Sequence, residues 1–368
     1  MPKFPVYSSS LYENIIRVLK PHVSMRRYEK ITQLFNYRLK DTVLIFENIR
    51  DPLNLAACFR TADAYGIQHI YILNNWGEVP FFTSFNNTIF QSTSNKKSTI
   101  GMNNQLNTSY STVDAGSIRW LTIHQYRNTQ ELLQHLRDNN YKIFSSDLAD
   151  GAEDIYQATH TALLSSSSSI PTISSPSSNS NPSPSSTSST AQVPYRPRIA
   201  LVFGNEKRGV SRGMAMNSDY RFFIPQLGFV QSLNISVACA LSTQLFLYRT
   251  NDYYTRSLQA HQFRSVMDNI PLPNHQKNQK TTKKNEHEEE EEIRDDISKK
   301  KAQIFKATVL SPPSIGTGNN QNTSLASTLQ CEPLPPDEMN ELLVRWLLGD
   351  LPMAAQILDR AGVRPDFY

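Results

Sequence analysis

Short apolar runs separated by amphipathic stretches fill the central part of the chain. The apolar runs are typical of strands buried on both faces, and the stretches between them repeat apolar residues at helical spacing. Strands are expected at 42–47, 68–73, 120–124, 141–146, 198–204 and 221–225, with helices at 53–65, 129–138 and 232–249. This alternation predicts an α/β fold with a parallel sheet covered on both faces, which would bind ligands in the loops beyond the carboxyl ends of its strands.

Amphipathic helices flank this region at both ends of the chain. Residues 9–20 and 25–39 each carry an apolar face, and the second stretch is crowded with basic side chains. Two more short helices are expected near the C-terminus, at 337–349 and 351–362. The expected units are an N-terminal helical extension at 1–40, an α/β domain at 41–262, a charged insertion at 263–333 and a C-terminal helical extension at 334–368.

Three polar segments interrupt the pattern. Residues 76–110 are rich in Asn, Thr and Ser and are expected to form a long loop. Residues 164–192 are mostly Ser, Pro, Thr and Asn, and 263–333 contains a Lys-rich stretch followed by a Glu-rich one. The last two compositions cannot bury enough apolar surface to fold, so disordered insertions are expected there.

Charge and cysteine usage narrow the class of protein. The net charge of +4 and pI near 8.8 allow a nucleic-acid partner without requiring one. The three cysteines have no metal-ligand spacing and are expected to be reduced thiols, so no metal is predicted and a cytoplasmic location is favoured. No apolar run has the length of a membrane-spanning helix, so no membrane association is expected.

The stretch NLAACFRTADAYG, from Asn54 to Gly66, places polar groups on an alanine-rich helix. Asn54 and Arg60 are six residues apart, and we expect both to lean toward the same end of the sheet. Arg60 has two interpretations: it pairs with a carboxylate or a helix end, or it serves a site.

A glycine loop containing Glu206 follows the apolar strand at 198–204. Gly204 and Gly209 have the separation found in a phosphate-binding loop, but Val210 stands where that loop has its lysine. Without that cation, nucleotide hydrolysis is disfavoured, and a ligand held by backbone amides and carbonyls fits better. A tight strand-to-helix turn with no ligand is the plain structural alternative.

A third polar constellation lies in IPQLGFVQSLNISVACAL, residues 224–241. Ser232 is predicted to cap the long helix that follows, which would put Asn234 inside the first turn, facing the loop. Capping alone would also explain both residues.

Together the three stretches resemble the motifs of the SpoU-type (TrmH) RNA ribose 2′-O-methyltransferases of the SPOUT superfamily. The first resembles N-x-x-A-x-x-R-T-A-x-A-x-G, the second a G-x-E-x-x-G loop after a strand, and the third I-P-x-x-G-x-x-x-S-L-N-x-S-x-A. The similarity covers roughly residues 26–262, less the insertions. The C-terminal helices, and the short basic extension in place of a separate N-terminal RNA-binding domain, resemble the branch that methylates guanosine 18 of the tRNA D-loop.

The resemblance implies a deep trefoil knot in the parallel sheet and an active site shared across a homodimer. It also implies S-adenosyl-L-methionine as cofactor and tRNA as partner. Catalysis would rest on Arg60, as base or as electrostatic clamp, supported by Asn54, Glu206, Ser232 and Asn234. Cofactor binding is expected at Ser146, Gly204, Ile224 and Leu233, and RNA binding at Arg26, Arg27 and Lys30 of the basic helix.

Two alternatives remain besides hydrolysis at the glycine loop. The first is a 2′-O-methyltransferase for ribosomal RNA or for another tRNA position. The second is a non-catalytic RNA-binding protein that keeps the SPOUT fold as a scaffold. Because Arg60, Glu206 and Asn234 are all present, the sequence favours an enzyme.

Overall fold

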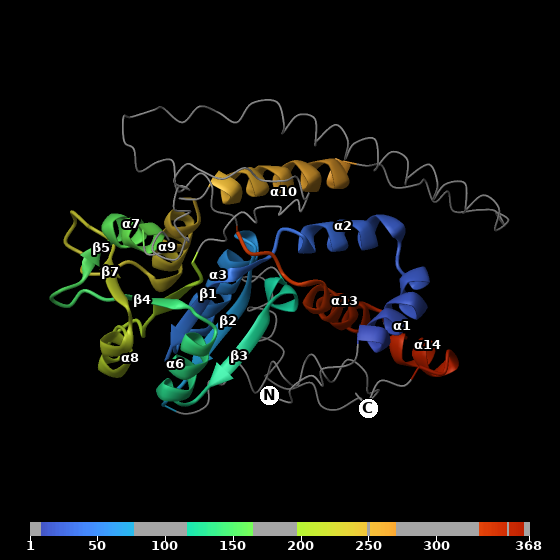
Figure 1. Cartoon of the computed structure of the whole chain (residues 1–368), viewed down its shortest axis with the longest axis horizontal. Coiled ribbons are helices and arrows are strands. Elements are labelled where there is room, and N and C mark those ends of the chain that lie inside the picture. The colour runs from blue at the N-terminus through green and yellow to red at the C-terminus, as the bar shows by residue number, and fades with distance from the viewer. Residues whose placement is uncertain are drawn as a thin grey trace, which may run out of the picture.

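A parallel sheet of seven strands forms the centre of the molecule (Figure 1). The computed structural model describes residues 9–76, 116–164, 197–248, 251–269, 331–351 and 353–363. The strand order is β3-β2-β1-β6-β4-β7-β5, and every pairing between these strands is parallel. The strands are β1 (Leu39–Glu47), β2 (Ile67–Leu73), β3 (Thr122–Tyr126), β4 (Lys142–Ser146), β5 (Glu153–Asp154), β6 (Ile199–Phe203) and β7 (Tyr220–Phe223).

Helices cover both faces of the sheet, as its continuous apolar strands require. On one face α3 and α9 pack against each other, and their apolar side chains join the central strands in one core. On the other face Leu132, Leu133 and Leu136 of α6 pack with Met214 of α8. The helices of this part are α3 (Pro52–Ala64), η2 (Ser117–Trp120), α6 (Thr129–Asp138), α7 (Ile155–Leu164), α8 (Arg212–Asn217), α9 (Ile235–Tyr248) and α10 (Asn251–Asn269).

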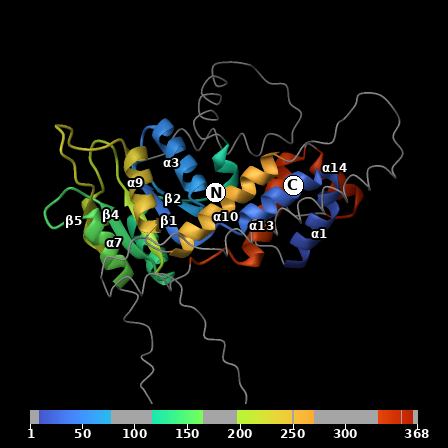
Figure 2. The same ribbon diagram turned by 90° about the horizontal axis from the view of Figure 1, so that it is seen from above.

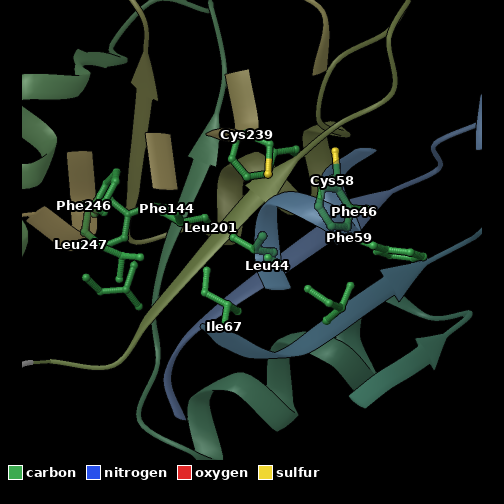
Figure 3. Close-up of a cluster of buried hydrophobic side chains, with 14 of the residues drawn as sticks. Leu44, Phe46, Cys58, Phe59, Ile67, Phe144, Leu201, Cys239, Phe246 and Leu247 are labelled. Carbon is green, nitrogen blue, oxygen red and sulfur yellow. The ribbon is translucent and has the colours of Figure 1, made fainter. Parts of the chain in front are cut away.

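The larger core lies between the sheet and the helices α3 and α9 (Figure 3). Leu44, Phe46 and Leu201 of the central strands are fully buried there. Cys58 of α3 and Cys239 of α9 point into this core as free, buried thiols, as their apolar context predicts. A hydrogen bond with Cys239 and burial together raise the pKa of Cys58, which keeps the thiol protonated and unreactive.

The two ends of the chain form a second, separate core (Figures 1 and 2). Ile15, Leu19 and Phe35 from the N-terminal helices pack against Trp346 and Leu347 from the C-terminal ones, and all five are buried. The predicted extensions therefore fold together, and we call them the helical unit. Its elements are α1 (Ser9–Leu19), η1 (Lys20–His22), α2 (Met25–Phe35), α13 (Pro336–Asp350) and α14 (Ala354–Arg360).

The structure differs from the sequence-based expectation in several places, and β5, α7 and α8 were not expected at all. The strand expected at 120–124 begins only at Thr122, because residues 117–120 form the short helix η2. The expected domain boundary at residue 262 lies inside α10, which no sequence argument predicted. The long helix α9 starts at Ile235 rather than after a Ser232 cap. Residues 77–110, 165–192 and 270–330 of the expected insertions lie outside the described residues.

Candidate functional site

The glycine loop after β6 is held by its own backbone. Asn205 and Gly209 exchange two backbone hydrogen bonds of 3.0 and 2.8 Å. A Cβ on Gly204 would lie 2.1 Å from the carbonyl carbon of Gly209 and from the nitrogen of Val210, so only glycine fits there. The side chain of Asn205 also accepts from the amide of Lys207 at 3.0 Å. The loop is therefore rigid and presents Glu206 to solvent.

The end of this loop does not suit a phosphate. The backbone nitrogen and hydroxyl of Ser211 donate to the two carboxylate oxygens of Glu47 at 2.8 and 2.6 Å. Glu47 is buried at the end of β1, directly under the start of α8. A buried carboxylate at this place repels a phosphate and occupies the hydroxyl that would bind its metal ion. Together with Val210, this contact removes the nucleotide-hydrolysis interpretation.

The start of α9 corrects one sequence prediction. The side chain of Asn234, not that of Ser232, caps the helix: its oxygen accepts from the backbone amide of Ser236 at 2.9 Å and from the Ser236 hydroxyl at 2.7 Å. Its backbone carbonyl accepts from Val237 and Ala238. Asn and Ser are equally good N-cap residues, and Ser232 and Asn234 lie only two positions apart. Ser232 lies exposed in the preceding loop.

The capping residue links the three polar stretches. The side-chain amide of Asn234 donates to the side-chain oxygen of Asn54 at 3.0 Å, and the Asn54 amide donates to Glu206 at 3.3 Å. These residues come from the starts of α9 and α3 and from the β6 loop, and Asn54 lies 152 positions from Glu206 and 180 from Asn234 in sequence. Asn54, Glu206 and Asn234, which the family resemblance assigns to one site, thus meet at the carboxyl edge of the sheet, and we call these three residues the polar triad.

The residues expected to bind a cofactor lie beside the triad along the same edge. Ser146 ends β4, Gly204 follows β6, and Ile224 follows β7; these three strands are neighbours in the sheet. Leu233 immediately precedes the triad residue Asn234 and is half-buried. In the same loop region, the side-chain oxygen of Gln226 is buried and has no hydrogen-bond partner among the described residues, so it can accept from a bound ligand.

Arg60 lies elsewhere, which corrects the expectation that it leans toward the same end of the sheet as Asn54. Six residues along a helix span about 9 Å, and the helix starts at the carboxyl edge. Arg60 instead lines a cleft together with Leu39 and Gly66. Leu39 is the first residue of β1 and Gly66 immediately precedes β2, so the cleft lies at the amino edge of the sheet. Its side chain is exposed. Within one chain, the polar triad and Arg60 thus belong to different surfaces.

This cleft has a volume of about 830 Å³ and is strongly basic. Its walls come from α2, the second half of α3 and α10, and its single carboxylate, Asp63, is hydrogen-bonded to Arg38. One guanidinium nitrogen of Arg38 and one of Arg256 are buried without a hydrogen-bond partner among the described residues. The Lys and Arg side chains of the cleft are Arg27, Lys30, Arg38, Arg60, Arg256 and Arg264.

The residues expected to bind RNA on α2 have different surroundings. Arg27 and Lys30 line the cleft, and the guanidinium of Arg27 also lies 5.3 Å from the ring centroid of Trp346. Arg26 donates from Nε to the carbonyl of Met267 at 3.0 Å and so holds the end of α10. Arg256 and Arg264 were not among the predicted RNA-binding residues, because the sequence of α10 has no clear apolar periodicity and did not predict a helix.

Residues 95–244 match the family model of the SpoU rRNA Methylase family. This region contains the glycine loop, the β7 loop and the start of α9. This part of the chain is therefore similar to SpoU-type methylases.

Proteins similar to this chain include two that are named as tRNA methyltransferases. The chain is 26% identical over 215 residues to the tRNA (guanosine(18)-2'-O)-methyltransferase of Thermus thermophilus, an alignment that covers 58% of this chain and 78% of the relative. It is 24% identical to the Escherichia coli protein of the same name, over 58% of this chain and 66% of the relative. The structure of the Aquifex aeolicus TrmH/SpoU tRNA modifying enzyme aligns with 78% of this chain and 98% of its own at 18% identity and a TM-score of 0.40.

Two further findings concern the described residues as a whole. None of their helices combines the length and the apolar character needed to cross a membrane. No group of three or more His, Cys, Asp and Glu side chains among them is arranged to hold a metal ion.

Proposed function

We propose that the protein transfers the methyl group of S-adenosyl-L-methionine to the ribose 2′-OH of guanosine 18 in the D-loop of tRNA. The relatives that carry this name match more than half of the chain. The observation that carries the proposal is the polar triad, because it joins residues of all three motif stretches at the edge where parallel sheets bind ligands. A structural scaffold has no need of this hydrogen-bonded arrangement.

The residues at the strand ends fit the cofactor. Its binding would use the backbone around Gly204, Ile224 and Leu233, near Ser146, and the unpartnered oxygen of Gln226 could accept from an amino group of the ligand. Val210, which stands where a phosphate-binding loop has its lysine, agrees with a ligand that carries no phosphate and a positive charge. S-adenosyl-L-methionine supplies an activated methyl group, so the protein has to orient the ribose hydroxyl and accept its proton.

Arg60 remains the candidate catalytic residue that contacts the ribose of the substrate. A guanidinium is protonated in nearly all proteins, so we favour a clamp on the substrate phosphate that also stabilises the developing alkoxide. The polar triad would hold the loops, with Ser232 beside it. Because Arg60 and the triad lie on different surfaces of one chain, we infer that the Arg60 of a second copy completes the site.

The surface of α9 supports such a homodimer. Val237, Leu241 and Tyr248 remain 45%, 45% and 42% exposed, and their spacing places them on one stripe of the helix. Leu227 and Phe229 in the preceding loop are fully exposed. Apolar stripes of this kind favour burial against another molecule. A trefoil knot around the glycine loop is a further proposal, which rests on the resemblance to the family.

The basic cleft is the proposed RNA surface. Its Lys and Arg side chains outnumber its carboxylates six to one, and the one carboxylate is already paired. Arg27 and Lys30 would contact phosphates directly. Arg26 was also expected to bind RNA; through its bond to Met267 it holds α10, which carries other basic residues of the cleft, in place. Each phosphate that a cation neutralises releases counterions, so binding should weaken with salt.

A ribosomal-RNA substrate is the main alternative, since the family description names rRNA. The first experiment is methyl incorporation from labelled S-adenosyl-L-methionine into unmodified tRNA transcript. The control transcript carries 2′-deoxyguanosine at position 18. Incorporation into the first and none into the second would establish both the reaction and the methylated atom. Equal incorporation into both would contradict the proposed position, and incorporation only into ribosomal RNA would favour the alternative.

The role of Arg60 is tested in the same assay. Arg60→Ala should abolish turnover while cofactor affinity, measured by calorimetry, stays near that of the unmodified protein. Arg60→Lys separates base from clamp: substantial activity in this variant would show that a positive charge is sufficient. Loss of cofactor binding in Arg60→Ala would remove Arg60 from the proposed catalytic role.

A further inference from the structure

Trp76 stands out among the three tryptophans of the chain. It follows the carboxyl end of β2 by three residues and keeps 44% of its surface exposed. The other two, Trp120 of η2 and Trp346 of α13, stack on each other with ring centroids 6.1 Å apart where η2 packs against the helical unit. An indole gains most from burial, so an exposed one on a ligand-binding edge calls for an explanation.

The backbone that presents Trp76 is fixed. Asn75 donates from its backbone amide to the side chain of Asn48 at 2.9 Å and from its side chain to Thr129 at 3.0 Å. The amide of Trp76 donates to the side chain of Asn74 at 3.3 Å. These bonds tie the turn to the loops after β1 and β3, so the indole is presented by a braced turn.

Two guanidinium groups lie over this ring. The Cζ atom of Arg50 is 5.5 Å and that of Arg208 is 5.2 Å from the Trp76 centroid. Both arginines are exposed. They belong to the loops that lead to the polar triad: Arg50 precedes Asn54 by four positions, and Arg208 follows Glu206 by two.

The same two loops are joined beneath the ring. The side-chain amide of Asn205 donates to the backbone carbonyl of Asn48 at 2.8 Å. The amide of Arg208 donates to the side-chain oxygen of Asn205 at 3.2 Å. A continuous set of hydrogen bonds thus connects the turn of Trp76 with the loop that carries Glu206. We call Arg50, Trp76 and Arg208 the stacking platform.

We propose that the stacking platform binds an unpaired nucleobase of the RNA substrate, close to the methylated ribose. This inference rests on the proposed function. Aromatic rings stack on bases of any sequence, and neighbouring guanidinium groups stack on the base or pair with the phosphates on either side of it. A base inside a duplex has both faces covered, so the ligand is a base that has left its stack. An acidic peptide would use the two arginines but would leave the indole without a role.

Intrinsic fluorescence can report on Trp76 through the difference between the unmodified protein and Trp76→Phe. The comparison is needed because Trp120 lines the basic cleft and Trp346 lies beside Arg27, so both can also respond to bound RNA. Full-length protein is titrated with unmodified tRNA, and affinity is measured independently by anisotropy of labelled tRNA. The RNA should quench part of the emission of the unmodified protein. Trp76→Phe keeps an aromatic ring, so it should bind nearly as tightly but show less quenching, by the share that Trp76 contributes. Trp76→Ala should weaken binding roughly 5- to 150-fold.

The matched control is Tyr156→Ala, which removes an exposed aromatic ring beyond β5, at the other side of the sheet from β2. It should leave affinity and quenching unchanged. Equal quenching in Trp76→Phe and the unmodified protein, or unchanged affinity in Trp76→Ala, would overturn the inference even if methylation is confirmed. Trp76-dependent quenching without methyl transfer would support the platform while the proposed reaction fails. If the protein binds no RNA, both proposals fall.

Discussion

Lowering the pH should loosen the attachment of the helical unit to the sheet, and His124 should account for much of the effect. His124 on β3 stacks on Tyr71, with ring centroids 4.6 Å apart. Its Nε2 lies 3.1 Å from Nδ1 of His69, whose Nε2 lies 2.7 Å from a carboxylate oxygen of Glu338 on α13. Burial, together with the nearby His69, lowers the pKa of His124 from 6.5 to about 3.

The sign and size of the effect follow from this shift. Between pH 6.5 and 3 the unfolded chain binds a proton at His124 that the folded protein excludes, so stability falls as the pH falls through this window. From pH 7 to pH 5, the loss from this one group is about 2 kcal/mol. Burial alone would raise the pKa of Glu338, but its contact with His69 lowers it overall. The stability that Glu338 contributes is therefore lost only below its usual pKa of 4.5, outside this interval.

The assay is urea unfolding at pH 7 and pH 5, followed by circular dichroism. The unmodified protein should lose about 2 kcal/mol more between these two pH values than His124→Gln, which cannot be protonated. Burial also lowers the pKa of the partly exposed His135, which adds a smaller loss of the same sign to both proteins. His22→Gln, in which an exposed histidine of η1 is replaced, should behave like the unmodified protein. An equal loss in His124→Gln and the unmodified protein would refute the reasoning.

Three further predictions concern the site, the RNA surface and the helical unit. Asn54→Asp replaces a donor amide 3.3 Å from Glu206 with a second carboxylate, so methyl transfer should fall at least tenfold in a steady-state assay, an effect of about 1.4 kcal/mol. Arg264→Gln in the cleft should reduce the slope of log affinity against log salt by about 1 in tRNA-binding titrations, whereas Arg212→Gln on α8 should leave it unchanged. Leu347→Ala, at a fully buried position in the helical unit, should cost about 2–5 kcal/mol in urea unfolding.

The parallel sheet could be predicted because its strands are continuous apolar runs, and β1 and β6 were found by these patterns alone. Asn54, Glu206 and Asn234 were assigned to one site only by the family resemblance, and the structure adds the hydrogen bonds that join them. The cap of α9 was placed two residues too early, because Ser232 and Asn234 are both good N-caps. Only the three-dimensional path of the loop decides between two such residues.

The position of Arg60 and the basic cleft could not be predicted, because both depend on how separate elements pack. Helical spacing fixes the angle between Asn54 and Arg60 but leaves open which neighbour each will face. Arg60 faces α10, a helix whose polar sequence gave no periodic signal. In the same way, the apolar faces near the two ends of the chain predicted helices. Nothing in either segment indicated that the N-terminal and C-terminal helices pack against each other.

Contacts on both sides of the segment between α10 and residue 331 explain why the fold tolerates a long insertion there. The last described part of α10 is held to α2 by the bond from Arg26 to Met267. The returning chain is fixed at Glu332, whose carboxylate accepts from Arg198 at 2.6 and 2.7 Å and whose carbonyl accepts from the amide of Lys40 at 2.9 Å. Closing a segment between two fixed points costs only about 0.6 kcal/mol more for each doubling of its length. Because both anchors belong to folded elements, the sequence between them can vary in length with little effect on the basic cleft.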